Sequence, residues 1–76
     1  MLPHPRRFET ATRYYVLCCT TDLWGQLLVS RYWGGKDSRR GNHRHDVVAN
    51  VEEATQHVMA IAQQRRQHGY LEVDHR

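Results

Sequence analysis

Two segments with the composition of β-strands are separated by only four residues, and this spacing restricts the fold more than any other feature. The segments, Thr10 to Thr21 and Gln26 to Trp33, are rich in β-branched, aromatic and aliphatic residues. A crossover between parallel strands needs about a dozen residues or more. The turn Asp22 to Gly25 therefore predicts an antiparallel hairpin.

A helix is predicted to follow, with signals at both of its ends. Asn50 is a suitable N-cap, and Glu53 lies three positions later, as in a capping box. Gly69 is suited to the left-handed conformation that ends many helices. Apolar residues recur between these ends at steps of three and four, which indicates one buried face. They are Val51, Ala54, Val58, Ile61 and Ala62.

Two further strands complete the predicted fold. Arg44 to Ala49 contains two valines, and Tyr70 to Val73 alternates in polarity. The predicted order is β-β-β-α-β, an α+β fold in which a small antiparallel sheet carries one helix on one face. Because one helix covers only one face, the other is left to an arm, a partner or solvent. Residues 1–9, with Pro3 and Pro5, are expected to form a flexible N-terminal arm, and residues 10–76 a single domain.

Length and composition restrict the class of protein. The chain has 76 residues, of which 39% are hydrophobic and 25% charged, as expected for one small globular domain. It has no apolar run of about 18 residues and no apolar leader at its start, so we expect a cytoplasmic protein that does not enter a membrane. The adjacent Cys18 and Cys19 are expected to be free thiols in a reducing compartment.

The positive charge is concentrated in one stretch. The chain has eleven Lys and Arg against eight Asp and Glu, a net charge of +3. Residues 34–45 contain Lys36, Arg39, Arg40 and Arg44 against one acid, Asp37, so this stretch alone accounts for the excess. Such concentration favours an anionic partner, and nucleic acid is the first candidate.

Trp33 lies at the end of its strand, directly before the basic stretch. An indole beside several cations can stack on a base or sugar while the cations hold phosphates. The alternative is that Trp33 belongs to the core and the basic stretch is a solvated turn. Trp24, in the hairpin turn, is a weaker candidate for stacking. The predicted nucleic-acid-binding residues are Trp33, Arg31, Lys36, Arg39, Arg40, His43 and Arg44.

Metal binding and catalysis have weaker signals. His43 and His45, followed by Asp46, could begin a metal site, but no further ligands occur at a recognisable spacing. Ser30 and Ser38 could be nucleophiles, but no sequence pattern places a general base and an orienting acid beside either of them. We therefore predict a protein that is not an enzyme and uses no cofactor or metal.

Several short motifs occur in an order that resembles the WGR domain, a family named for a Trp-Gly-Arg triplet. The resemblance extends over about residues 13–73. The matching segments are Tyr-Tyr-Val-Leu at 14–17, Arg-Tyr-Trp-Gly-Gly at 31–35, Gly41, Glu-Glu-Ala at 52–54 and His-Gly-Tyr at 68–70.

The resemblance implies a nucleic-acid-binding module like those of poly(ADP-ribose) polymerases and of small bacterial proteins. It places Trp33 against a nucleic-acid strand, and it puts Gly35 where the family has the triplet arginine. The expected partner is nucleic acid, with DNA first, bound with low sequence specificity. The alternative is a protein–protein module that uses the uncovered sheet face or a strand edge, including self-association.

Overall fold

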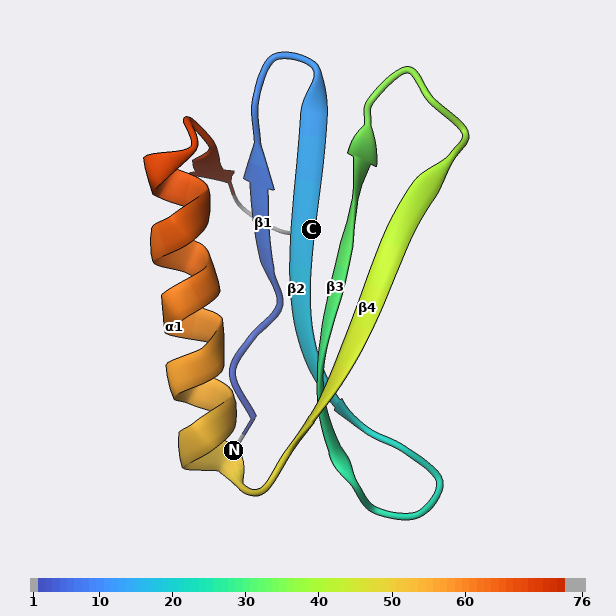
Figure 1. The fold of residues 1–76 in the computed structure, drawn as a ribbon, viewed down its shortest axis with the longest axis vertical. Coiled ribbons are helices and arrows are strands. Elements are labelled where there is room, and N and C mark those ends of the chain that lie inside the picture. Colours follow the sequence, from blue (N-terminus) through green and yellow to red (C-terminus); the bar gives the residue numbers. More distant parts are fainter. Residues whose placement is uncertain (1, 74–76) are drawn as a thin grey trace.

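The computed structural model describes residues 2–73, which form a five-stranded antiparallel sheet with one helix on one face (Figure 1). This confirms the predicted α+β class. The spatial order of the strands is β4-β3-β2-β1-β5. The elements are β1 (Arg6–Glu9), β2 (Arg13–Thr21), β3 (Leu27–Gly35), β4 (Gly41–Val48), α1 (Val51–Gln67) and β5 (Leu71–Val73).

Strand β1 corrects the expectation of a flexible arm over residues 1–9. Arg6–Glu9 pairs with β2 on one side and with β5 on the other, and the Phe8 side chain is fully buried. Pro3 and Pro5 precede this strand, so they remove no hydrogen bond from its ladder. The order in sequence is therefore β-β-β-β-α-β, one strand more than predicted.

The strand register divides the side chains between a face covered by α1 and an open face. Tyr15 lies opposite Trp33, Leu17 opposite Arg31, and Val29 opposite Asp46, all on the helix-covered face. The buried core forms on this side, between the sheet and α1. It comprises Phe8, Tyr15, Leu17, Val29, Val48, Ala54, Val58, Ile61 and Ala62.

The helix begins and ends with the predicted signals. The Glu53 N–H donates to Asn50 Oδ1 at 2.8 Å, and Gly69 has a φ of +86° just after the helix. Four members of the predicted apolar stripe are buried, but Val51 is 39% exposed. Val51 is the first residue of α1.

Strands β3 and β4 are longer than predicted because glycines make room for Tyr14. A Cβ atom at Gly34 would lie 3.1 Å from the Tyr14 hydroxyl oxygen, and one at Gly41 would lie 2.9 Å from it. Gly34 and Gly41 pair with each other, so the ladder continues across this point on the open face. The basic connection is therefore only residues 36–40, and His43 and Arg44 are strand residues.

Replacing Phe8 with alanine tests the role of β1. We expect Phe8→Ala to lower the free energy of unfolding by about 3–4 kcal/mol, because it removes a fully buried ring from a small core. Urea denaturation followed by circular dichroism measures the change. Leu23→Ala is the control, since Leu23 is 95% exposed and its truncation should cost less than about 0.5 kcal/mol. Equal stability of the two variants would contradict the placement of β1.

Candidate nucleic-acid interface

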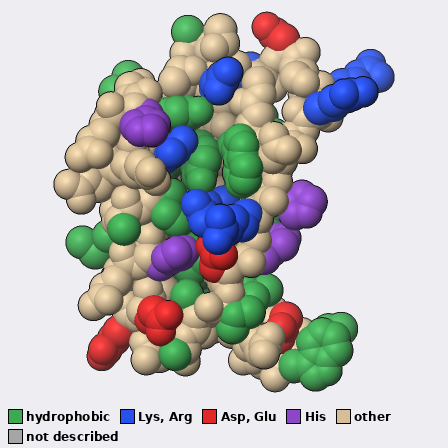
Figure 2. Space-filling model, viewed as in Figure 1, with side chains coloured by type: hydrophobic (Ala, Val, Ile, Leu, Met, Phe, Trp, Pro, Cys, Tyr) green, Lys and Arg blue, Asp and Glu red, His purple; other side chains and the backbone are tan. Residues whose placement is uncertain are grey.

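Trp33 forms one wall of a pocket on the helix-covered face. Its ring stacks on Tyr15, with centroids 5.7 Å apart and planes 15° from parallel, and it packs against the core while staying partly exposed. The pocket has a volume of about 290 Å³. Its lining residues are Arg13, Trp33, Gly34, Gly35, Arg40, Asn42 and Tyr70. In Figure 2, hydrophobic side chains are visible at the centre of this face, with Lys and Arg side chains above and below them.

The sheet register brings the pocket's two arginines to Trp33. Arg13 begins β2 opposite Gly35, the last residue of β3. Arg40 ends the short connection between β3 and β4, where its N–H donates to Ser38 Oγ at 3.1 Å. Within residues 2–73, neither guanidinium has a carboxylate within 4.0 Å. Both charges are therefore available to a ligand.

A third arginine, from α1, fixes the aromatic residues next to the pocket. The Arg65 guanidinium carbon lies 4.6 Å from the Tyr15 ring centroid and 5.5 Å from that of Tyr70. Tyr15 and Tyr70 also meet edge to face at 6.2 Å. Trp33, Tyr15, Arg65 and Tyr70 thus form a continuous stack of rings and a cation, which holds the pocket in one shape.

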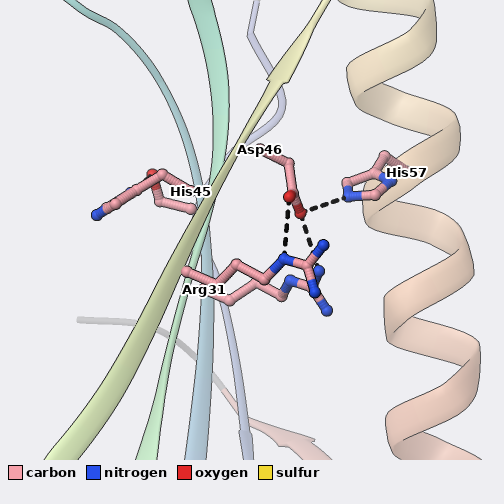
Figure 3. A network of polar contacts seen from close by, with 6 residues as sticks. Arg31, His45, Asp46 and His57 are labelled. Atoms are coloured by element: carbon pink, nitrogen blue, oxygen red, sulfur yellow. Dashed lines mark hydrogen bonds and ion pairs between the residues drawn. The ribbon is translucent and has the colours of Figure 1, made fainter.

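Asp46 ties together β3, β4 and α1 beside this stack (Figure 3). Its carboxylate accepts from Arg31 at 2.8 Å and from Arg44 at 3.0 Å, and it lies 3.2 Å from His57 Nε2. The hydrogen bond from Arg31 is the main reason that the pKa of Asp46 lies far below its usual value. His57 and Arg44 lower it further, against an opposing effect of burial.

The Asp46 cluster holds two of the predicted phosphate-binding residues. With His57 neutral, Arg31, Arg44 and Asp46 carry a net charge of +1. Arg31 is mostly covered, whereas the Arg44 side chain is 64% exposed. Arg44 can therefore still meet a ligand, and Arg31 contributes mainly by holding the cluster together.

Two other predicted residues lie away from Trp33. The Lys36 ammonium pairs with Glu9 at 2.8 Å, and Glu9 also pairs with Arg7; both contacts lower the pKa of Glu9, Lys36 contributing most. His43 lies opposite Tyr32 and therefore faces the open side of the sheet. The structure thus gathers Trp33, Arg31, Arg40 and Arg44 on one face and separates Lys36 and His43 from them.

Arg39 is exposed in the connection between β3 and β4, and no carboxylate of residues 2–73 pairs with it. Arg13, Arg65 and Tyr70 were not among the predicted site residues, but they lie in or next to the pocket. Tyr70 was part of the His-Gly-Tyr motif, whereas only the strand and helix packing reveals the two arginines. Trp24 is 83% exposed in the hairpin turn, at the end of β3 opposite to Trp33.

The histidine, aspartate and cysteine side chains do not assemble a metal centre in the part of the chain that the structure describes, where no group of three or more ligands occurs. His43 and His45 share the open side of the sheet by register. Figure 3 shows His45 and Asp46 pointing to opposite sides, with Asp46 toward α1. Cys18 and Cys19 are free thiols on opposite faces of β2, and burial raises the pKa of each.

Comparison with models of known protein families, with characterised proteins and with solved structures gives no match. Over residues 2–73, α1 is too short and too polar to cross a membrane. The pocket beside Trp33 is therefore the feature from which a function can be inferred.

Replacing Asp46 with asparagine tests the Asp46 cluster. Because the folded-state pKa of Asp46 is lowered, its stabilising effect is complete above the usual aspartate pKa of about 4 and is lost as pH falls below that value. We expect Asp46→Asn to reduce the free energy of unfolding by about 1–2 kcal/mol at pH 7. The difference between the two proteins should shrink steadily between about pH 4 and pH 2.

The matched control for this experiment is Asp22→Asn. Asp22 Oδ1 accepts from the N–H groups of Trp24 and Gln26, and an asparagine oxygen can accept both bonds. Urea denaturation over a series of pH values should show little effect of this change. A difference between Asp46→Asn and the parent protein that stays constant down to pH 2 would contradict the assigned role of Asp46.

Proposed function

We propose that this protein is a non-enzymatic nucleic-acid-binding module of WGR type, with DNA the first candidate ligand and low sequence specificity. The observation that carries the proposal is the pocket in which a partly exposed Trp33 lies beside Arg13 and Arg40. Neither arginine is neutralised by a carboxylate of residues 2–73. A flat ring in the same pocket as two guanidinium groups suits a nucleotide, which combines a stackable surface with phosphates.

The composition of the pocket supports a nucleotide chain over an apolar ligand. Its lining contains two arginines and no acidic residue, and Arg44 extends the positive surface along β4. Guanidinium groups bind phosphate oxygens through paired hydrogen bonds. Stacking of a base or sugar on an aromatic side chain contributes about 1–3 kcal/mol and depends little on base identity. Both contributions predict binding that is sensitive to salt and tolerant of sequence.

Removing the two pocket arginines should weaken binding and reduce its dependence on salt. We expect Arg13→Ala with Arg40→Ala to lower the affinity for a short DNA duplex about tenfold or more. The slope of log affinity against log salt should fall by about 1.5–2, one counterion contribution for each lost contact. Fluorescence anisotropy at several salt concentrations, with blunt, nicked and single-stranded oligonucleotides, measures both quantities.

Arg66→Ala serves as the control for loss of charge outside the pocket. Arg66 is half-exposed on α1, 3.9 Å from Glu72, and does not line the pocket. Its loss should change affinity less than the loss of either pocket arginine. If the double variant binds DNA as tightly as the parent protein at low salt, the pocket is not the binding site.

Gly35 offers a test that adds charge. A Cβ atom there would lie 3.6 Å from Ser38 Cβ and 3.8 Å from the Thr12 carbonyl oxygen, which is ordinary contact distance. Gly35 also lines the pocket. We expect Gly35→Arg, which restores the family's triplet, to fold normally and to bind DNA several-fold more tightly.

Gly35→Glu is the counterpart, with a side chain of similar reach and opposite charge. It should fold equally well and bind more weakly than the parent protein. Thermal unfolding verifies the fold of both variants, and anisotropy titration compares their affinities. Equal affinity of the arginine and glutamate variants would show that the ligand does not approach this pocket.

A further inference from the structure

Strand β4 is a long edge strand that nothing in residues 2–73 covers. It lies at one end of the sheet, pairs only with β3, and runs in unbroken register from Gly41 to Val48 (Figure 1). Protein edges are commonly protected by proline, by charged side chains, especially lysine, or by a β-bulge, because unpaired backbone groups bind other strands. β4 contains no proline, lysine or bulge, and its two charges, Arg44 and Asp46, have opposite sign.

The hydrogen-bond pattern shows which backbone groups of β4 face outward. The Lys36 N–H donates to the Thr12 carbonyl at 2.8 Å, and the Asp22 N–H donates to the Gln26 carbonyl at 3.0 Å. Bonded and non-bonded pairs alternate along an antiparallel ladder. These two bonds show that the even-numbered residues of β3 bond to β2, so the odd-numbered residues of β3 bond to β4. Their partners, the even-numbered residues of β4, therefore direct their backbone groups to β3. The odd-numbered ones direct their N–H and C=O groups to the free edge: Gly41, His43, His45 and Val47.

The charges of β4 are self-complementary in one register only. If two copies pair antiparallel with His45 on the two-fold axis, Arg44 of each copy lies opposite Asp46 of the other. Sliding by two residues instead places Arg44 opposite Arg44, or Asp46 opposite Asp46, and such like-charge pairs are destabilising. If one copy of β4 slides by one residue, the outward-facing N–H and C=O groups of one strand lie opposite residues whose backbone groups point to β3, so the strands cannot form a regular ladder.

Most side chains of β4 are exposed, whereas Asp46 already pairs with Arg31 and Arg44 of its own chain and would gain Arg44 of the second copy as a further partner. Arg44 is largely exposed, and Val47, at 60% exposed, would lie opposite His43 of the second copy. His45 is held in place because its Nδ1 lies 2.7 Å from Oγ of the buried Ser30. The outward backbone groups of β4 and its exposed side chains are therefore available for a symmetric strand pair.

From these observations we propose that β4 binds β4 of a second copy of this chain, in antiparallel register about His45, to form a continuous ten-stranded sheet. The two proposals share Arg44, but this interaction uses the outward backbone groups of β4, whereas nucleic-acid binding uses the pocket beside Trp33. One strand pair buries less surface than a typical stable interface of about 1,600 Å², so we expect a dissociation constant on the order of 10–100 μM. The two helices would lie on the same side of the joined sheet.

The first test is the mass of the untagged chain in solution. Light scattering or sedimentation from about 10 μM to about 1 mM, which brackets the expected affinity, should show a rise from 9.0 kDa toward twice that value.

Val47→Pro removes an outward N–H and should weaken the dimer at least tenfold while leaving oligonucleotide binding unchanged. Arg44→Glu, which places acids opposite Asp46, should weaken it similarly without changing the backbone. A chain that stays monomeric at 1 mM, or a dimer unaffected by Arg44→Glu, would overturn the proposal.

The second test measures the register by cross-linking. With Cys18 and Cys19 replaced by serine, His45→Cys should form a disulfide between copies on mild oxidation, because position 45 faces its own symmetry mate. Val47→Cys is the matched control on the same face, and it should not cross-link because position 47 faces His43 of the other copy. Cross-linking at 47 in place of 45 would refute the proposed register.

Discussion

The limited reach of one helix over five strands determines most of this structure. The 17 residues of α1 bury Ala54, Val58, Ile61 and Ala62 against the sheet, and the hydrophobic core ends where that cover ends. At the border of this core, α1 supplies Arg65 to the stack of rings and His57 to the Asp46 cluster. Partial exposure of Trp33 follows directly, because the ring lies at the border between the core and the uncovered part of the same face.

Ion pairing on this face separates arginines that support the structure from arginines that are free. Arg31 and Arg44 share one carboxylate with His57, which joins two strands to the helix. Arg65 is committed to two tyrosine rings. The charge that remains for a ligand comes from positions such as Arg13 and Arg40, which no carboxylate of the described chain neutralises. Net charge along the sequence is therefore a poor measure of the charge offered to a partner.

The sequence predicted those parts of the fold that depend on local chemistry. The hairpin followed from a short turn, and the helix from Asn50, Glu53 and Gly69. Strand β1 was missed because Pro3 and Pro5 suggested a flexible arm, whereas β1 lies between β2, which follows it directly, and β5 from near the end of the chain, with Phe8 in the core. The ladder through Gly34 and Gly41 was missed because the need for glycine there arises from Tyr14 on another strand.

The candidate site was predictable in its centre and not in its surroundings. Trp33 and Arg40 are close in sequence, so their proximity could be inferred from the chain alone. Arg13 reaches the same pocket only through the β2–β3 register, and Lys36 leaves it because Glu9 attracts the ammonium group to the open face. When a basic stretch forms part of a strand, its side chains point alternately to the two faces of the sheet, so its charges are separated. Arginines from other elements then decide which face retains unpaired positive charge.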